Sequence, residues 1–207
     1  MKPYSIARAV ELLGDSGVLV CPVIAFPHGN STTRSKVAEA VEAVELGGHE
    51  IDMVVNVGKV MSGEWSYVSE EIKAINDAVV SRGAILKVIF ETDFLKDEHI
   101  IKLCQICSQI GVAFVKTSTG FGFVQGSDGK YSYTGATPRI IALMRKHCAP
   151  SVRIKASGGV RTFDAWLKVV AAGAARVGTS STTSILEEAK KRGIGHKDVD
   201  VTVSLDK

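Results

Sequence analysis

The chain has 207 residues, of which 45% are apolar and 23% are charged, and its formal net charge is +3. This length and this balance predict a single globular domain with a sizeable buried core. The charges form no long run of one sign, so we expect no nucleic-acid surface. No apolar stretch is long enough to cross a bilayer, and the first 13 residues lack the order of a signal peptide. We therefore expect no membrane contact and a cytoplasmic location.

The four cysteines and five histidines show no spacing typical of a disulfide framework or a metal site. Cys104 and Cys107 do form a C-x-x-C pair. They share one helical face with apolar neighbours, which favours buried packing over redox chemistry. We predict no metal ligands from these residues.

Short apolar runs rich in β-branched residues alternate with amphipathic stretches from end to end. Strands that alternate with helices predict βαβ units and a parallel sheet covered on both faces, so the predicted class is α/β. In chain order, the patterns predict a helix at 5–13, a strand at 18–26, a helix from the Ser31-Thr32-Thr33 cap to Gly47, strands at 50–56 and 85–91, a helix at 98–110, a strand at 113–117, a loop at 120–135, a helix at 137–147, and strands at 152–156 and 176–178.

Two sheet architectures are compatible with this order. The first strand ends in Phe26-Pro-His-Gly-Asn30, which lacks the G-x-G-x-x-G of an open nucleotide-binding sheet. Polar residues instead follow several different strands, as in a TIM (β/α)₈ barrel. Only six of the eight strands are found, and no strand precedes the helix at 5–13. We predict an incomplete barrel that forms one domain over residues 1–207, with a disordered tail at 190–207.

Two lysines lie inside apolar strands, where a lysine is rarely buried without a partner. They are Lys116 and Lys155, and small residues and glycine follow both. A free lysine with a pKa of ~10.4 is almost always protonated at neutral pH. A second ammonium and a dry surrounding favour the neutral amine, which can add to a carbonyl as a Schiff base. The pair predicts a nucleophilic lysine; an ion pair under a loop is the alternative.

Asp52 lies in an otherwise apolar strand and needs a cationic partner if it is buried. The two lysines supply one, so Asp52 is a candidate proton donor and acceptor, with a plain counter-ion as the alternative. Lys87 is a third strand lysine. Lys87 and Glu91 are four residues apart, so in a strand both side chains should face the same side. This predicts a salt bridge between the two and only a supporting electrostatic role for Lys87.

Glycine and serine follow the last two predicted strands, in Ser157-Gly-Gly159 and Gly178-Thr-Ser-Ser181. Glycine lets backbone amides approach an anion, and barrels commonly bind phosphate at the loops after their last two strands. These segments predict a substrate that carries a phosphate. An ordinary turn or helix cap would also explain either of them.

Six segments in order resemble those of the deoxyribose-phosphate aldolases, which are class I (Schiff-base) aldolases. The most specific are Lys116-Thr-Ser-Thr-Gly120 and Lys155-Ala-Ser-Gly-Gly159, and the resemblance extends from Lys2 to about Leu186. It implies that Lys116 forms the Schiff base, that Lys155 perturbs it and helps to transfer protons, and that Asp52 works with Lys155 as proton donor and acceptor.

The resemblance also implies the reaction: reversible cleavage of 2-deoxy-D-ribose 5-phosphate to glyceraldehyde 3-phosphate and acetaldehyde, in deoxynucleoside catabolism, without metal or organic cofactor. The expected partner is thus a phosphorylated sugar or aldehyde, and a homo-oligomer is left open. The implied substrate- and phosphate-binding residues are Gly158, Gly159, Gly178, Ser180 and Ser181, with Thr119 beside them and Cys21 near the pocket without an essential role.

Three departures from the family pattern keep other interpretations open. Lys2-Pro-Tyr4 resembles the end of a second strand, so two N-terminal strands are missing; residues 122–133 resemble an insertion, and the tail after Ala189 differs. An open barrel exposes strand edges and admits water to the lysines. The chain could therefore be a catalytically impaired truncated homologue or fragment, or another phosphosugar Schiff-base enzyme on the same fold.

Overall fold

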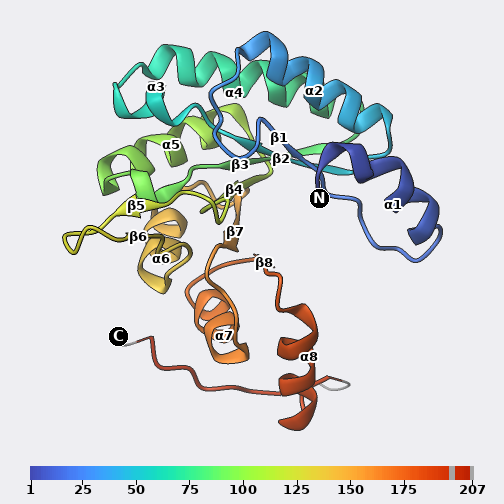
Figure 1. The fold of residues 1–207 in the computed structure, drawn as a ribbon, viewed down its shortest axis with the longest axis vertical. Coiled ribbons are helices and arrows are strands. Elements are labelled where there is room, and N and C mark those ends of the chain that lie inside the picture. The colour runs from blue at the N-terminus through green and yellow to red at the C-terminus, as the bar shows by residue number, and fades with distance from the viewer. Residues whose placement is uncertain (196–198, 206–207) are drawn as a thin grey trace.

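Six parallel strands form one curled sheet in the computed structural model, which describes residues 1–195 and 199–205 (Figure 1). The predicted α/β class and the half-barrel of six strands are confirmed. In sheet order the strands are β1 (Val23–Ile24), β2 (Glu50–Val54), β3 (Ile85–Ile89), β4 (Phe114–Lys116), β7 (Arg153–Ser157) and β8 (Arg176–Gly178).

Helices connect the strands and cover the convex face of the sheet (Figure 1). Thr32 caps one of them, as predicted, by accepting a hydrogen bond from the Ser35 amide, and Gly111 ends another in a left-handed conformation. The helices are α1 (Ile6–Leu13), α2 (Thr33–Glu45), α3 (Val57–Met61), α4 (Trp65–Val80), α5 (Asp97–Ile110), α6 (Pro138–His147), α7 (Phe163–Ala171) and α8 (Thr182–Lys191), with 3-10 turns η1 (Pro3–Ser5) and η2 (Thr92–Phe94).

The curl of the sheet brings distant strands together on its concave face. Strands β2 and β8 stand four places apart in the sheet, which in a flat sheet would separate them by about 19 Å. The side chains of Glu50 on β2 and Arg176 on β8 nevertheless form an ion pair. The curl therefore brings side chains from opposite ends of the concave face into contact, although β1 and β8 are not paired with each other in the described residues.

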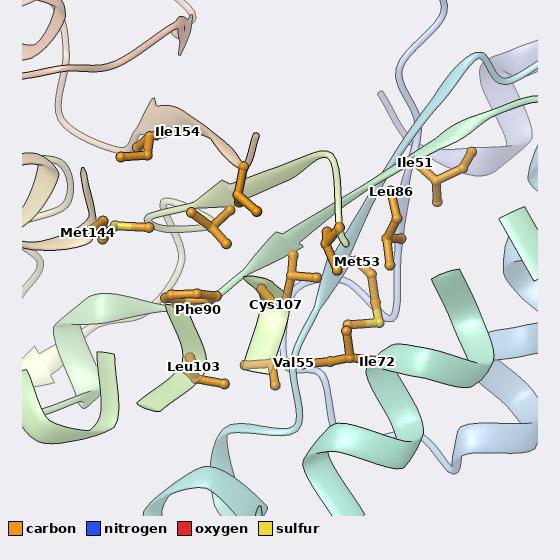
Figure 2. Packing of buried hydrophobic residues seen from close by; sticks show 14 of the residues in the cluster. Ile51, Met53, Val55, Ile72, Leu86, Phe90, Leu103, Cys107, Met144 and Ile154 are labelled. Atoms are coloured by element: carbon orange, nitrogen blue, oxygen red, sulfur yellow. The ribbon is translucent and has the colours of Figure 1, made fainter. Parts of the chain in front are cut away.

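The apolar core lies between the convex face and the helices (Figure 2). Met53 and Leu86 point from the strands toward Ile72 of α4, because successive strand residues face opposite sides of the sheet. Cys104 and Cys107 of α5 are fully buried in this core, which confirms the packing interpretation of the C-x-x-C pair. The alternate strand positions are left to face the concave interior.

Four local predictions need correction or completion. The strand at 18–26 shrinks to Val23–Ile24, and the loop at 120–135 contains a small hairpin of β5 (Val124–Gln125) and β6 (Tyr131–Ser132). Residues Pro3–Ser5 form a 3-10 turn rather than the end of a strand. Just before this turn, the Met1 carbonyl accepts a hydrogen bond from the Val23 amide of β1 at 2.9 Å. Helix α8 includes Lys191 from the predicted tail, in which residues 196–198 and 206–207 lie outside the described residues.

No helix in the described part of the chain combines the length and apolarity needed to cross a membrane.

Candidate active site

Asp52 is the point at which four of the predicted site residues meet. Its side chain is nearly inaccessible, with Asp52 only 1% exposed. One carboxylate oxygen, Oδ2, accepts hydrogen bonds from Lys116 Nζ at 2.8 Å and from Lys155 Nζ at 2.7 Å. The other, Oδ1, accepts from Lys87 Nζ at 3.0 Å and from Cys21 Sγ at 3.2 Å. Three lysines thus share one carboxylate.

Strand register and curl produce this convergence. Asp52 lies beside Lys87 across the β2–β3 pair, and Lys116 lies beside Lys155 across the β4–β7 pair. Because the two-residue period is kept from strand to strand, all four side chains face the concave interior. The curl then closes the distance between β2 and β7, which a flat sheet would hold about 14 Å apart.

The interior keeps these groups away from water even though the sheet has two free edges. Lys116 is 7% exposed and Lys87 is fully buried. Only a small part of the Lys155 side chain, 12%, is accessible. The lysines therefore remain largely inaccessible to solvent, although the half-barrel has open edges.

The two best-buried lysines of the cluster have pKa values that move in opposite directions. Burial lowers the pKa of Lys116; Asp52 opposes this effect, and the Lys155 ammonium adds to it. Burial would likewise lower the pKa of Lys87, but Asp52, Cys21 and Glu50 outweigh it, and the pKa of Lys87 is raised. Of these two amines, Lys116 is therefore the one that gives up its proton more readily.

Asp52 itself is held as a carboxylate. Burial would raise its pKa, but the ammonium groups of Lys116, Lys155 and Lys87 outweigh burial and hold the pKa of Asp52 well below its usual range. A charged Asp52 can orient both neighbouring amines at once. Its proton affinity rises whenever one of those amines becomes neutral, because one stabilising cation is then lost.

The predicted salt bridge between Lys87 and Glu91 is wrong. Lys87 instead pairs with Glu50 at 2.7 Å and with Asp52 at 3.0 Å. Strand β3 ends at Ile89, and Glu91 has a left-handed backbone with φ +59°, so the two-residue alternation no longer applies to it. The carboxylate of Glu91 accepts hydrogen bonds from the amide and hydroxyl of Thr119 instead.

Sequence reasoning missed Glu50 and Arg176. Glu50 precedes Asp52 by two residues and shares its parity, which was a readable signal for a second interior carboxylate. Arg176 opens the last strand, and no local pattern indicated that it would reach Glu50 across the interior. The two residues extend the charge cluster to the edge of the sheet.

The loops after β7 and β8 lie side by side, since the two strands are paired. Gly158 and Gly159 have φ of +88° and +78°, which favours glycine at both positions. Gly178 packs closely against the two preceding interior residues: a Cβ there would lie 3.3 Å from Cβ of Ser157 and 3.4 Å from Cε of Lys155. Ser181 precedes α8, and its amide donates to the Thr179 hydroxyl at 2.9 Å. Ser180 beside it is exposed.

A second hollow, of about 1200 Å³, lies between α7, α8 and the segment at 199–203. Its walls are mostly apolar, with Trp166, Leu186 and Val201 among them, and Lys190 is the ionisable side chain that they include. It offers no paired acid and base. In the described residues, no three His, Cys, Asp or Glu side chains are grouped so as to hold a metal ion. Asp52 and its lysines are therefore the candidate active site.

Comparison with known proteins identifies the class of this protein as a lyase. Residues 2–187 match the model of the family described as DeoC/LacD family aldolase. The chain belongs to this family.

Two relatives in the family carry the same name. The chain is 42% identical over 202 residues to the deoxyribose-phosphate aldolase of Rhodopirellula baltica, covering 98% of this chain and 79% of that protein. It is 45% identical to the deoxyribose-phosphate aldolase of Caldanaerobacter subterraneus subsp. tengcongensis, covering 94% of this chain and 80% of that one.

Solved structures agree with the fold. A putative deoxyribose-phosphate aldolase from Coccidioides immitis superposes with a TM-score of 0.82 at 36% identity, over 91% of this chain and 71% of that one. The aldolase QR15 gives a TM-score of 0.82 at 38% identity, over 93% and 80%. The tetrameric deoxyribose phosphate aldolase from Aeropyrum pernix gives 0.79 at 30% identity, over 92% and 76%.

Proposed function

We propose that this chain is a deoxyribose-phosphate aldolase that reversibly cleaves 2-deoxy-D-ribose 5-phosphate to glyceraldehyde 3-phosphate and acetaldehyde. The observation that carries the proposal is the sharing of one buried Asp52 oxygen by Lys116 and Lys155. Relatives that are 42% and 45% identical over nearly the whole chain bear this name. The substrate class is thus a phosphorylated sugar or aldehyde.

Lys116 is the proposed nucleophile. Its neutral amine adds to the aldehyde carbon C1 of the open-chain sugar, and loss of water gives an iminium ion. The iminium accepts the electron pair of the C2–C3 bond as that bond breaks. The C3 hydroxyl loses its proton, glyceraldehyde 3-phosphate leaves, and an enamine remains on Lys116. Protonation of the enamine and addition of water then release acetaldehyde and restore the amine.

Lys155 and Asp52 are the proposed proton carriers. A carboxylate with a lowered pKa is a weak base on its own, so we assign the transferable proton to the Lys155 ammonium and its orientation to Asp52. When Lys116 forms the neutral adduct, Asp52 loses a cation and its proton affinity rises. The pair can then exchange a proton with the substrate and return it.

The loops after β7 and β8 are the proposed phosphate site. Glycines with positive φ at Gly158 and Gly159 leave backbone amides accessible, and the start of α8 near Ser181 adds a favourable dipole. Gly178 and Ser180 complete this set. Thr119 remains a proposed substrate contact, although Glu91 holds its hydroxyl. Cys21 lies against Asp52 and Lys87 without a proposed step.

Borohydride trapping tests the proposed function. Acetaldehyde and borohydride should leave one ethyl group on the protein, and peptide mapping should place it on Lys116. Lys116→Ala should form no adduct. Lys73→Ala removes an exposed lysine on α4 and should behave as the wild type. Unchanged adduct yield from Lys116→Ala would sink the assignment, and an unreactive wild type would favour a non-catalytic homologue.

Two finer features belong to the same proposal. Substrate profiling should show 2-deoxy-D-ribose 5-phosphate preferred over other phosphosugars, which separates this activity from a different phosphosugar aldolase. The Aeropyrum pernix relative is tetrameric, and we propose that this chain also forms a homo-oligomer, which light scattering after size-exclusion chromatography would measure.

A further inference from the structure

Glu50 lies inside the curl of the sheet between two cations that come from different strands. One of its oxygens, Oε2, forms an ion pair with Lys87 Nζ at 2.7 Å, and the same oxygen pairs with Arg176 Nη1. Glu50 is only 4% exposed. A buried carboxylate with two cationic partners has its charge well compensated, so these contacts are expected to persist.

Arg176, the partner of Glu50, lies on the strand at the edge of the sheet. It opens β8, which pairs with β7 and has no other strand partner in the described residues. The Arg176–Glu50 ion pair therefore spans the concave interior, from the outermost strand to β2. It holds β8 in the curled position that carries Gly178 against Lys155.

Lys87 links Glu50 to Asp52 by forming an ion pair with each. Its ammonium is shared between Glu50 on one side and Oδ1 of Asp52 on the other, at 2.7 and 3.0 Å. With Oδ1 occupied by Lys87, the second oxygen of Asp52 is the one directed at Lys116 and Lys155. The rotation of the Asp52 carboxylate thus depends on how strongly Glu50 holds Lys87.

We propose that Glu50 and Arg176 are positioning residues, which act through Lys87 in opposite directions to set how strongly the Asp52 carboxylate holds Lys116, and so couple the edge strand β8 to the reacting amine. This inference rests on the proposed function, because it concerns the same lysine. It assigns a role to two residues that touch none of the reacting atoms.

Opposite changes at the two ends of this chain of ion pairs should act on Lys116 with opposite signs. Without the Glu50 charge, Lys87 turns fully to Asp52, which then stabilises the Lys116 ammonium less, so the pKa of Lys116 falls. Without the Arg176 charge, Glu50 binds Lys87 more strongly, Asp52 is freed for Lys116, and the pKa of Lys116 rises. The other charged or titratable groups that act on Lys116 are Lys155, Cys21, Glu91 and the α-amino group of Met1.

A matched control for Arg176→Met is Arg153→Met, because both arginines contact the ring of Phe114. The guanidinium groups of Arg153 and Arg176 lie over its ring, 4.2 and 5.2 Å from the centroid. Arg153 is exposed, and the ion pair with Glu50 involves Arg176. Arg153→Met and Arg176→Met therefore both remove a cation–π contact with the same ring, while Arg176→Met also removes the ion pair.

The test is the pH dependence of the rate at which acetaldehyde and borohydride trap the full-length protein. Trapping requires the neutral amine, so its midpoint follows the pKa of Lys116. Glu50→Gln should move the midpoint to lower pH and Arg176→Met to higher pH, each by about half a unit or more. Arg153→Met should leave it in place, and Arg176→Lys should return it most of the way to the wild type.

Shifts of the same sign in the two variants, no shift in either, or an equal shift in Arg153→Met would each overturn the proposal. Circular dichroism and thermal melting show whether each variant is folded. Should Arg176→Met not fold, Glu50→Gln decides alone, because an acid shift supports the proposal and any other result contradicts it. A wild type that forms no adduct would refute the proposed function itself, whereas a wild type that reacts with unshifted variants refutes only the positioning role.

Discussion

Two buried groups of lysine and carboxylate in this molecule differ in the number of their partners. Between α2 and α4, Lys36 pairs with Glu71 at 2.8 Å and donates to the Val54 carbonyl at 3.0 Å. Neither side chain is accessible to solvent. In the concave interior, Asp52 is shared by Lys87, Lys116 and Lys155. The first group is balanced one to one, and the second is not.

The comparison shows that a lowered pKa does not by itself identify a nucleophile. Burial lowers the pKa of Lys36 and of Lys116 alike. Lys36, however, has Glu71 as its own counter-ion, and it lies between helices on the convex side of the sheet. Lys116 competes with another ammonium for one oxygen and faces the interior beside two glycine loops. Because burial acts on both lysines, the competition for one carboxylate is what distinguishes Lys116, the proposed nucleophile, from Lys36.

Asp52→Asn, which alters the carboxylate that the three lysines share, should cause the largest loss of turnover. The amide cannot accept and return a proton as the carboxylate does, so kcat should fall by about 10² or more, while some Lys116 adduct still forms. Steady-state kinetics and borohydride trapping measure the two properties separately. Parallel loss of both would contradict the proton-carrying role of Asp52.

Lys36→Met should break the balanced pair and reduce stability rather than chemistry. It leaves Glu71 as an unpaired buried charge, which typically costs about 3–5 kcal/mol of unfolding free energy. Guanidinium denaturation followed by circular dichroism gives the value. The double variant Lys36→Met/Glu71→Leu should recover much of the loss, because no charge is left buried. A double variant as unstable as the single one would argue against this explanation.

Lys155→Met should change the pKa of Lys116. The Lys155 ammonium lowers the pKa of Lys116, so its removal should raise that pKa. The neutral fraction of Lys116 at neutral pH then drops roughly tenfold for each unit. The rate of adduct formation as a function of pH measures the shift. A profile that stays in place would show that Lys155 does not perturb Lys116.

The smallest expected effect is that of low pH on the stability that Asp52 contributes. The pKa of Asp52 is lowered in the folded state, so its contribution to stability is present above the unfolded value of ~3.9 and is lost as pH falls toward the folded value. The difference in unfolding free energy between wild type and Asp52→Asn should therefore narrow at about pH 3 relative to neutral pH. A difference independent of pH would contradict the lowered pKa.

The fold was readable from the sequence because its signals are local and repeated. The alternation of apolar runs and helical patterns indicated all six sheet strands, and Thr32 was recognised as part of a helix cap. The hairpin of β5 and β6 was missed, although Asp128-Gly129 at its tip is a typical turn signal. The short β1 was overestimated because an apolar run does not show where its hydrogen-bonded partner begins.

The site was only partly readable, for a different reason. Lys116, Lys155 and Asp52 stood out because charges are rare in apolar strands, and the structure brings them together; their catalytic roles stay predictions. The partner of Lys87 was wrong because the left-handed backbone at Glu91 leaves no pattern in the sequence. The link between Glu50 and Arg176 depends on the curl of the sheet, which no local signal records.

The central claim is that Lys116 loses its proton more readily than an ordinary lysine, because burial and the neighbouring Lys155 ammonium together outweigh the attraction of the Asp52 carboxylate. An NMR titration of isotope-labelled lysine side chains tests this directly, with the Lys116 signal identified by its loss in Lys116→Arg. We expect this signal to titrate at a clearly lower pH than that of exposed Lys73. Titration together with Lys73 would contradict the claim.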